Sequence, residues 1–575
     1  MRWCCVIVLV LTACSSKPPA TPEAVESLIE HGNLQEAAAQ SKRLIIAHPA
    51  DPALRVLLGR IYLAQKDGAG AYDAFDHARA LGASEESTRK GLVEGLFLQG
   101  RFEQVLSMLP TSLDRSELPA PLLRLRLEAL LRTPLARERD IFLDSQQVLV
   151  AGGADGVASL EAVLRGEGAV DTNADQIRRA IAYWSCQQVG DDQDPPYVTE
   201  PPAWAVRDAA SRRTLRVGPD FELKTPSAAA RVARDGDDVE IQAGRYLGDV
   251  AVWRANDLSI HAVGGKAVLE ARGASAENMG IWVVRGNNVS ISGIRFSGAR
   301  STDQNGSGIR GLGNNLWVSE SEFYDNEDGI LTAERPGSDV IVERSVFVGN
   351  GAGDGYSHNV YVGTVQRLVF RFNYSASAKI GHELKSRAVA NYILYNRLAD
   401  EADGTGSYTI DLPDGGFALI LGNEIQQGPN SENRHIVSLG TERPGGREHR
   451  FIFAFNTFYN GQFPATLIRD MTGAGVMLID NIFSGAPANI DARTRLDAEN
   501  PFISPDNLVD GRGGDYRLKP TATVIDSGDA TESVEGVSIL PEFEYRHPAG
   551  VRRRHEVWRR DPGAHEFCGW PEHRD

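Results

Sequence analysis

The chain has 575 residues, of which 42% are hydrophobic and 24% are charged, a globular composition too long for one ordinary core. Its formal net charge of -17 argues against a broad nucleic-acid surface, because binding phosphates requires a basic footprint. The whole molecule would also repel an acidic polymer, so a local cluster of cations must receive any such ligand.

The N-terminus is an apolar run that ends in a cysteine. The run is too short to cross a bilayer, and Leu11-Thr12-Ala13-Cys14 closes it. This pattern resembles the lipobox of bacterial lipoproteins; an uncleaved anchor helix is the alternative. The resemblance implies a signal peptide over 1–13, a lipid on Cys14 and a tether over 14–22. Because no acidic residue follows Cys14, it also implies the periplasmic face of the outer membrane, with the lipid as the sole membrane contact.

The cysteines follow from this export prediction. The chain has five cysteines, and removal of the signal peptide leaves Cys186 and Cys568 beside Cys14. An oxidising compartment permits a disulfide between Cys186 and Cys568, and two unpaired cysteines are the alternative.

Residues 23–188 are expected to be helical, and the first part, to about residue 110, repeats every 34 residues. The middle repeat places apolar residues at the offsets of the tetratricopeptide signature: Leu58, Gly59, Tyr62, Ala71, Phe75 and Ala78. Small residues let paired helices approach, and large ones fill the groove between pairs. The region resembles tetratricopeptide lipoproteins of exopolysaccharide systems, and the resemblance implies a protein partner docked on the repeats, with a secretion machine as the candidate. A generic helical bundle is the alternative. An acidic, proline-rich stretch predicts a linker over 189–214.

From 215 to 530, β-rich runs separated by Gly, Asn and Asp predict a solenoid. One apolar column recurs mostly every 24 to 27 residues, with one step of 33: Phe296, Phe323, Phe347, Tyr374, Leu398, Ile425, Phe458 and Phe483. A second column keeps the same register: Ile281, Ile309, Ile330, Val360, Leu384, Ile410 and Ile436. Two places before members of the first column stand four asparagines, which predict a ladder of stacked amides: Asn396, Asn423, Asn456 and Asn481.

The two columns predict a right-handed parallel β-helix; a propeller is the alternative, but its four-stranded repeat would be longer. Residues 215–567 resemble the pectate-lyase-like β-helix superfamily. A short helix over 227–234, started by Thr225-Pro226, is expected to cap the open N-terminal end. The segment 531–575 is expected to pack on the solenoid as a tail. The chain is thus predicted to be multidomain, with a helical repeat domain followed by a pectin-lyase-like β-helix.

Three short blocks recur about one turn apart along the second column: His358-Asn359-Val360-Tyr361, His382-Glu383-Leu384-Lys385 and Tyr408-Thr409-Ile410-Asp411. Adjacent turns of a β-helix lie about 4.8 Å apart. The fourth residues of the blocks are therefore predicted to stack on one outer face as a candidate site.

Strand alternation assigns the other members of these blocks to faces. Asn359, Glu383 and Arg387 share the outward parity, which makes Asn359 and Glu383 candidate substrate ligands. His358, His382 and Tyr408 have the opposite parity, so we expect them in the preceding turn, where they either lean over the groove or pack. Two residues on adjoining turns, Asp414 and His435, are further candidate substrate ligands.

These residue types suit β-elimination at a uronic acid. That reaction needs a base for the C5 proton, a cation on the carboxylate and a proton donor to the leaving oxygen. Lys385, with its pKa lowered by the nearby Arg387, is the predicted base, and Arg387 is the predicted carboxylate ligand. Tyr361 or Tyr408 is the predicted acid. The histidines His358 and His382 can take either proton role, and Asp411 completes the catalytic set.

Three alternatives to a lyase stay open. C5 epimerisation needs the same parts, with the proton returned to the other face. Hydrolysis needs two carboxylates, and Glu383, Asp411 and Asp414 are available, but the surrounding cations and tyrosines fit elimination better. A polysaccharide-binding scaffold without catalysis is the third, because β-helices also serve as plain scaffolds.

Lys385-Ser386, with Asn391-Tyr392 and Tyr395-Asn396 after it, resembles the segment around the base of chondroitinase-B-like and alginate lyases. That family has an arginine on the next turn, where this chain has 408–412, and a spaced acidic pair before the lysine as calcium ligands. Only Glu383 stands there, so neither the arginine nor calcium is carried over, and no metal or cofactor is predicted. The predicted ligand is an acidic polysaccharide. Trp282, Trp317 and Arg310 either form neighbouring sugar subsites or fill core and surface.

Overall fold

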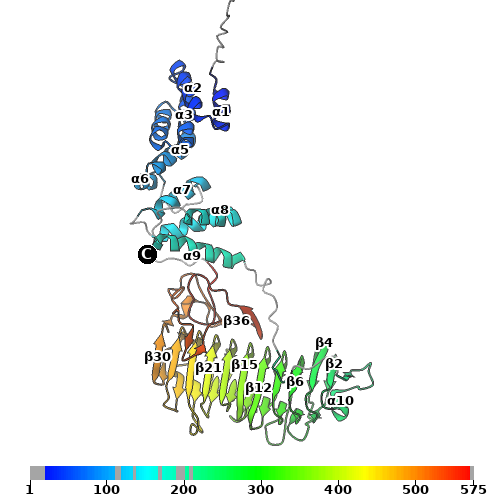
Figure 1. The fold of residues 1–575 in the computed structure, drawn as a ribbon. Helices are drawn as coiled ribbons and strands as arrows, with labels where there is room; N and C mark the ends of the chain where they lie inside the picture. The colour runs from blue at the N-terminus through cyan, green and yellow to red at the C-terminus, as the bar shows by residue number, and fades with distance from the viewer. Residues whose placement is uncertain are drawn as a thin grey trace, which may run out of the picture. The chain divides into compact units, whose positions relative to one another are not determined.

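The computed structural model describes residues 20–109, 118–133, 138–165, 171–188, 201–205 and 212–569 (Figure 1). The chain divides into two compact units, one up to Trp184 and one from Ser185. The predicted signal peptide, Cys14 and most of the linker 189–214 lie outside the described residues.

The first unit is a helical repeat region. Its helices are α1 (Pro22–Glu30), α2 (Leu34–Ala47), α3 (Pro52–Ala64), α4 (Gly68–Ala80), α5 (Glu85–Leu98), α6 (Phe102–Met108), α7 (Ala120–Leu131), α8 (Glu138–Leu164) and α9 (Asp171–Gln188). Gly59 of α3 and Gly91 of α5 lie against the ring of Phe75 in α4, where a Cβ would stand 2.7 and 2.2 Å from ring atoms. This close approach explains why the repeat uses small residues at those positions.

Helix α8 is the one helix among the described residues that is long and apolar enough to cross a membrane by length and composition. The helix breaks at Gly153, whose φ of 55° and ψ of -129° are not helical. The side chains of Phe142 and Leu149, before the break, and of Leu160, after it, are buried. The parts of α8 before and after Gly153 therefore both pack against other residues of the protein.

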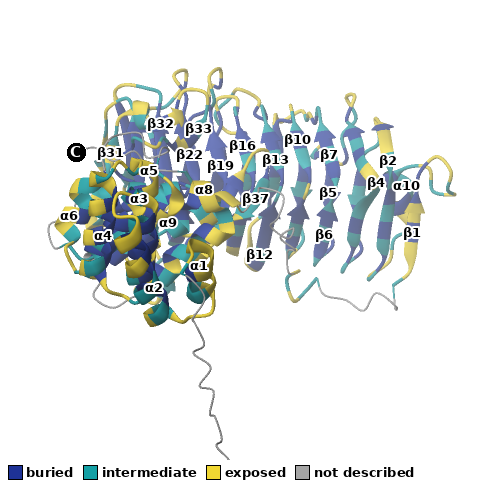
Figure 2. Cartoon of the chain, turned by 90° about the horizontal axis from the view of Figure 1, so that it is seen from above, coloured by how far each residue is buried: buried dark blue, intermediate teal, exposed yellow. Residues whose placement is uncertain are grey.

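The second unit is a right-handed parallel β-solenoid of about ten turns, as predicted. A ten-stranded sheet forms one wall: β3 (Ala251–Trp253), β5 (Gly280–Val284), β8 (Ser307–Gly311), β11 (Asp328–Thr332), β14 (Val360–Val362), β17 (Leu384–Ser386), β20 (Ile410–Leu412), β23 (His435–Leu439), β26 (Ala465–Asp470) and β29 (Ala488–Asp491). Buried residues run along the strands, and exposed ones gather at the turns (Figure 2).

The other two walls belong to one 21-stranded sheet. The first wall contains β1 (Thr214–Val217), β2 (Asp238–Leu247), β4 (Ser259–Glu270), β6 (Val289–Ser292), β9 (Leu316–Ser319), β12 (Arg335–Glu343), β15 (Val365–Arg371), β18 (Ala390–Leu394), β21 (Phe417–Leu421), β24 (Arg450–Ala454), β27 (Val476–Ile479) and β30 (Thr494–Ala498). The second contains β7 (Ile294–Ser297), β10 (Glu322–Tyr324), β13 (Val346–Val348), β16 (Tyr374–Ala376), β19 (Arg397–Ala399), β22 (Glu424–Gln427), β25 (Thr457–Asn460), β28 (Ile482–Gly485) and β31 (Phe502–Ile503).

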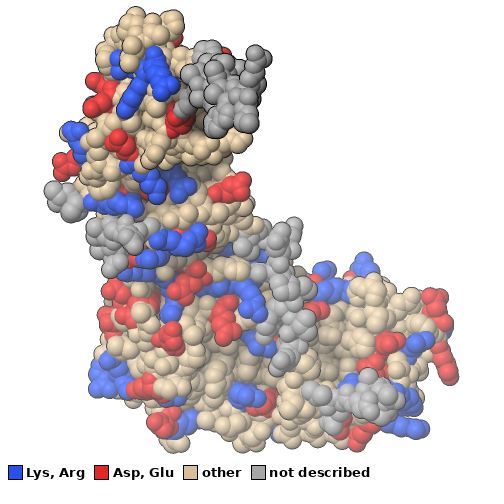
Figure 3. Space-filling view, turned by 45° about the horizontal axis from the view of Figure 1, so that its top comes forward, with Lys and Arg blue, Asp and Glu red and all other residues tan. Residues whose placement is uncertain are grey.

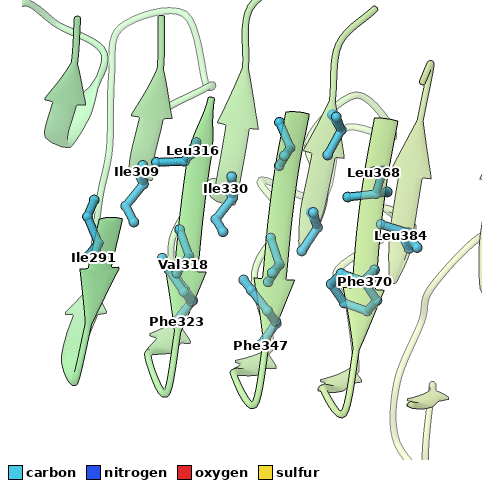
Figure 4. Packing of buried hydrophobic residues seen from close by; sticks show 14 of the residues in the cluster. Ile291, Ile309, Leu316, Val318, Phe323, Ile330, Phe347, Leu368, Phe370 and Leu384 are labelled. Atoms are coloured by element: carbon cyan, nitrogen blue, oxygen red, sulfur yellow. The ribbon is translucent and has the colours of Figure 1, made fainter. Parts of the chain in front are cut away.

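The predicted apolar columns fill the interior (Figure 4). The rings of Phe296, Phe323 and Phe347 stack with centroids 5.1 and 4.6 Å apart. The next member is Ser375 rather than Tyr374, because Phe347 pairs with Ser375 and Tyr374 faces outward. This single-residue error matters, since it hides a polar stretch of the interior.

The second column is right from Ile309 to Ile410 and displaced by one residue at each end. Ile309 pairs with Trp282 instead of Ile281, and Ile410 pairs with Val437 instead of Ile436. In both places two adjacent apolar residues are buried, so hydrophobicity alone does not identify the column member.

The predicted asparagine ladder is confirmed. The side-chain amide of Asn396 donates to Oδ1 of Asn423 at 2.9 Å, and Asn423 donates in turn to Asn456 at 2.9 Å. The ladder continues to Asn481 and extends beyond the prediction to Asn373 and Asn500. Each Oδ1 also accepts the backbone N–H of the asparagine before it, as in the 2.8 Å bond from Asn396 to Asn423.

Helix α10 (Pro226–Val232), which begins after the predicted cap residue Thr225, contacts the first strands and covers the N-terminal end of the solenoid. The C-terminal tail packs on the side of the solenoid, where Val534, Ile539 and Phe543 contact an apolar outer face of the 21-stranded sheet (Figure 1). The tail contains two short hairpins, β34 (Ser533–Val534) with β35 (Val537–Ser538) and β36 (Phe543–Arg546) with β37 (Gly550–Arg553). A further hairpin, β32 (Leu508–Asp510) with β33 (Asp515–Leu518), comes before it.

The predicted disulfide between Cys186 and Cys568 is formed. The two Cα atoms lie 5.7 Å apart, and 382 positions separate the cysteines in the sequence. The bond therefore ties the end of the tail to a residue that precedes the whole solenoid.

Candidate functional site

The three reactive residues stack on the outer face of the ten-stranded sheet as predicted. Tyr361 of β14 pairs with Lys385 of β17, and Lys385 pairs with Asp411 of β20. Their strand neighbours Val360 and Leu384 are fully buried in the core, which fixes the outward direction of the column. We call Tyr361, Lys385 and Asp411 the reactive column.

Lys385 is held between two carboxylates. Its Nζ lies 3.1 Å from Oδ2 of Asp411 and 2.8 Å from Oε1 of Glu442. Burial lowers the pKa of Lys385, but Asp411 and Glu442 together outweigh burial and raise the pKa above its ordinary value. The prediction of a lysine with a lowered pKa is therefore wrong: Lys385 is a cation here and no base.

Arg387 lies just beyond β17 and joins the column from the side. Its Nε donates to Oη of Tyr361 at 2.9 Å, its Nη1 to Oδ1 of Asp414 at 2.5 Å, and its Nη2 to Oε2 of Glu442. Burial lowers the pKa of Arg387, but Glu442, Tyr361 and Asp414 raise it further, so the group stays charged. Lys385 Nζ and Arg387 Cζ lie 5.6 and 5.8 Å from the centre of the Tyr361 ring.

The histidines lie in the turn before their strands, as expected, and of the two alternatives they lean over the reactive column. The rings of His358 and His382 stack 4.5 Å apart, and Tyr408 stacks on His382 at 4.9 Å. His358 also meets Tyr361 edge-on, and His382 Nε2 lies 3.5 Å from Oδ2 of Asp411. Alternation does not apply to these residues because each lies in the turn before its strand begins.

Hydrogen bonds fix the protonation of both histidines. His358 Nδ1 accepts the backbone N–H of His382 at 3.0 Å, and His382 Nδ1 accepts that of Tyr408 at 3.1 Å. Each neutral ring therefore carries its proton on Nε2. Burial lowers the pKa of both histidines. Lys385 and Arg387 lower the pKa of His358 further, and His358 and Lys385 lower that of His382 further. Neither nitrogen is free to accept a proton, which leaves His382 as a donor to Asp411.

Asp411 is the group with proton-accepting capacity. Its side chain is 2% exposed, and burial raises its pKa to about 6 against the lowering effect of Lys385. Oδ2 faces Lys385 and His382, whereas the buried Oδ1 has no hydrogen-bond partner among the described residues. A buried carboxylate oxygen without a partner is costly, so it marks a position where a ligand atom would bind.

Two predicted substrate ligands face the interior instead. Asn359 donates to Ser375 Oγ at 3.1 Å and to a carboxylate oxygen of Glu383, and both residues are fully buried. Glu383 also accepts the backbone N–H of Ala378 at 2.9 Å. Burial and the neighbouring Asp400 raise the pKa of Glu383 well above its usual range. This polar cluster occupies the space left by Ser375 in the aromatic column.

The remaining candidates are spread around the column. Asp414 is buried, and besides Arg387 it pairs with Arg443 at 3.1 Å, so it anchors a loop. His435 lies beyond Tyr408, with ring centres 6.4 Å apart, and burial lowers its pKa. Trp282 is a core residue and Trp317 bonds to Glu343 at 2.8 Å on the 21-stranded sheet.

Arg310 shares the outer face with the reactive column. It pairs with Leu331, which pairs with Tyr361, so Arg310 lies two turns before that tyrosine. Its Nε and Nη1 are buried without a hydrogen-bond partner in the described part of the chain. Two nitrogens in the same row without a hydrogen-bond partner among the described residues offer a second position for an acidic group.

Sequence reasoning missed Glu442, which lies on the loop between β23 and β24. The backbone N–H groups of Glu442 and Arg443 donate to Pro413 O at 2.9 and 3.2 Å. Arg447 donates to the carbonyls of Arg387 and Ala388 at 3.0 and 3.1 Å. The 33-residue step before Phe458 was the available signal, since it marks a turn with room for such a loop.

Two of the cavities in the described part of the solenoid lie elsewhere, and neither of these two is lined by a member of the reactive column. One of about 480 Å³ is lined by Arg397, Glu424 and His565, and one of about 860 Å³ by Tyr459 and Lys519 among others. The first is built from ion pairs that hold the tail, such as His565 of the tail with Glu424 at 2.6 Å. We place the candidate site on the reactive column because its cations and unpartnered carboxylate oxygen point to a ligand.

One group of described residues has the composition of a metal site. Ligand atoms of Asp238, Glu240 and His261 lie within 4.8 Å of one another on β2 and β4. Glu240 is paired with Arg216 at 3.3 Å, and the group is remote in sequence from the reactive column. On the face shown in Figure 3, positive and negative side chains are interspersed. In comparisons with protein families, curated proteins and solved structures, no match to this chain was found.

Proposed function

We propose that the reactive column binds an acidic polysaccharide and cleaves it by β-elimination at a uronic acid. One observation carries this proposal: two cations, a tyrosine and a carboxylate with a pKa of about 6 converge on one outer face. In a chain with a net charge of -17, such a cluster is a local attraction for a polyanion. A parallel β-helix is compatible with this use, because it presents long rows of side chains to an extended polymer.

The roles differ from those predicted from sequence. Lys385 and Arg387 would hold the uronate carboxylate and stabilise the negative charge that spreads into it as the C5 proton leaves. Asp411 Oδ1 would take that proton, the C4–O bond would break, and a C4–C5 double bond would form. Tyr361 would protonate the departing oxygen. His382, neutral with its proton on Nε2, would orient Asp411.

We propose in addition that the protein is exported and tethered. A lipid on Cys14 would hold the protein at the periplasmic face of the outer membrane, and the helical repeats would dock a protein partner of an exopolysaccharide machine. The Cys186–Cys568 disulfide supports export, since such bonds persist in oxidising compartments. Metabolic labelling with palmitate tests the anchor, because Cys14→Ser would abolish incorporation.

A panel of alginate, pectate and glycosaminoglycans tests the function. Ultraviolet absorbance of the unsaturated product would identify a lyase, and NMR of the polymer would reveal a changed C5 configuration if the enzyme is an epimerase. Binding without either product would favour a non-catalytic scaffold. If no uronate polymer is bound and none yields a product, the proposal is overturned.

A further inference from the structure

Glu442 holds both cations of the site at once. One carboxylate oxygen contacts Lys385 Nζ at 2.8 Å, and the other accepts from Arg387 Nη2. This is how a carboxylate binds between two cations, with one oxygen for each partner. Lys385 and Arg387 come from β17 and its following turn, whereas Glu442 arrives from a loop 57 residues after Lys385.

The exposed fractions of the three side chains show that Glu442 lies outermost and covers Lys385 and Arg387. The side chain of Glu442 is 43% exposed, whereas those of Lys385 and Arg387 are 11% and 9% exposed. A ligand carboxylate therefore reaches the cations only by taking the place of Glu442. Burial raises the pKa of Glu442, but Arg387 and Lys385 together outweigh burial and lower the pKa to about 2, so the group is a carboxylate at neutral pH.

We propose that the space between Lys385 Nζ and Arg387 Nη2 is the subsite for the carboxylate of the polymer, and that Glu442 fills it in the unliganded protein. This inference rests on the proposed function and names the group that the site selects. The exchange replaces one carboxylate with another, so both buried cations stay paired throughout. A small anion that forms weaker ion pairs than a carboxylate would not displace Glu442 from the subsite.

The loop is built for this exchange. Its backbone is held to Pro413 O and its Arg447 to the carbonyls of Arg387 and Ala388, so the main chain stays in place. Among the described residues, the Glu442 side chain pairs with the two cations alone, and Gly445 and Gly446 follow closely. Rotation of that one side chain opens the subsite.

Removing the internal carboxylate tests the proposal. Glu442→Gln keeps the shape of the side chain and loses its charge. The substitution is made in an Asp411→Asn protein, which leaves the oligomer uncleaved, and its affinity is compared with that of the Asp411→Asn parent. Calorimetry with galacturonate and mannuronate trisaccharides measures affinity, with maltotriose as the neutral probe. We expect Glu442→Gln to bind an acidic trisaccharide about tenfold more tightly, because no internal carboxylate then occupies the subsite and every molecule can bind the ligand. Binding of maltotriose is expected to stay unchanged.

Glu448→Gln is the matched control, since Glu448 is an exposed carboxylate on the same loop. Its affinity is expected to equal that of the parent. Equal or weaker binding of both acidic trisaccharides by Glu442→Gln, or no binding by either protein, would overturn the subsite. Tighter binding together with no product from any polymer would leave the subsite standing and reject the lyase.

Discussion

The Nζ of Lys385 lies 3.1 Å from Oδ2 of Asp411, one turn further along the solenoid. The solenoid itself sets this contact, because adjacent strands lie about 4.8 Å apart and equivalent side chains must touch. The pairing keeps the lysine charged while burial keeps the pKa of the aspartate near 6. A base and a cation thus stand side by side at neutral pH, which is the arrangement that elimination at a uronate requires.

The pH dependence of catalysis is expected to report Asp411. Its pKa is raised to about 6, so the carboxylate is protonated and inactive below that pH and able to accept a proton above it. Product formation from the best polymer should therefore rise through about pH 6 and level off. Initial rates across this range measure it, and a rate that falls as pH rises through 6 would contradict the assignment.

The asparagine ladder is expected to be a main source of stability. Asn423→Ala would remove the acceptor of both the side-chain amide and the backbone N–H of Asn396, in a fully buried position. Each unsatisfied group costs about 1–3 kcal/mol, so we expect a loss of roughly 2–4 kcal/mol in the free energy of unfolding. Chemical denaturation measures it. Asn430→Ala, at an exposed turn asparagine, is the control, and equal effects of the two would argue against the ladder.

Glu383→Gln tests the interior position of Glu383. Burial and Asp400 raise its pKa in the folded protein well above the ordinary value. In the unfolded chain the group ionises at its ordinary pKa, so the fold loses stability as pH rises above that ordinary pKa. Glutamine cannot ionise, and we expect the variant to melt at or above the temperature of the wild type at neutral pH, with the larger gain at higher pH. A marked loss of thermal stability would show that the carboxylate is needed in its charged form.

His565 is expected to fasten the tail through its charge. Burial lowers its pKa, but Glu424 at 2.6 Å and Glu544 at 3.5 Å raise it to about 9. A histidine pKa raised in the folded state stabilises fully below about pH 6.5 and loses this contribution as pH rises through 9. The shift corresponds to about 3 kcal/mol. The difference in unfolding free energy between wild type and His565→Gln should shrink over that range. A difference independent of pH would contradict the charged pairing.

Repeating positions could be predicted from sequence because spacing constrains them. Phe323, Phe347 and the asparagines recur at one-turn intervals, and their stacking follows directly. Spacing does not distinguish adjacent residues of similar type, which is why Trp282 replaces Ile281 in the column and Ser375 replaces Tyr374.

The site was predicted in position but not in electrostatics. Strand alternation located Lys385 correctly, and it failed for Glu383, which lies in the turn before β17 and faces the interior. The pKa of Lys385 depends on Glu442, a residue 57 positions later that no local pattern connects to it. Such contacts between distant loops arise only once the chain is folded.

The most direct test of the account is cleavage of uronate polymers by the wild type and by Lys385→Ala, followed by absorbance of the unsaturated product. Removal of a cation at the developing charge is expected to slow the reaction by about 10²–10³. Lys379→Ala, at an exposed lysine paired with Asp325, should keep the wild-type rate. A wild-type rate for Lys385→Ala would contradict the claim that the reactive column carries out the reaction.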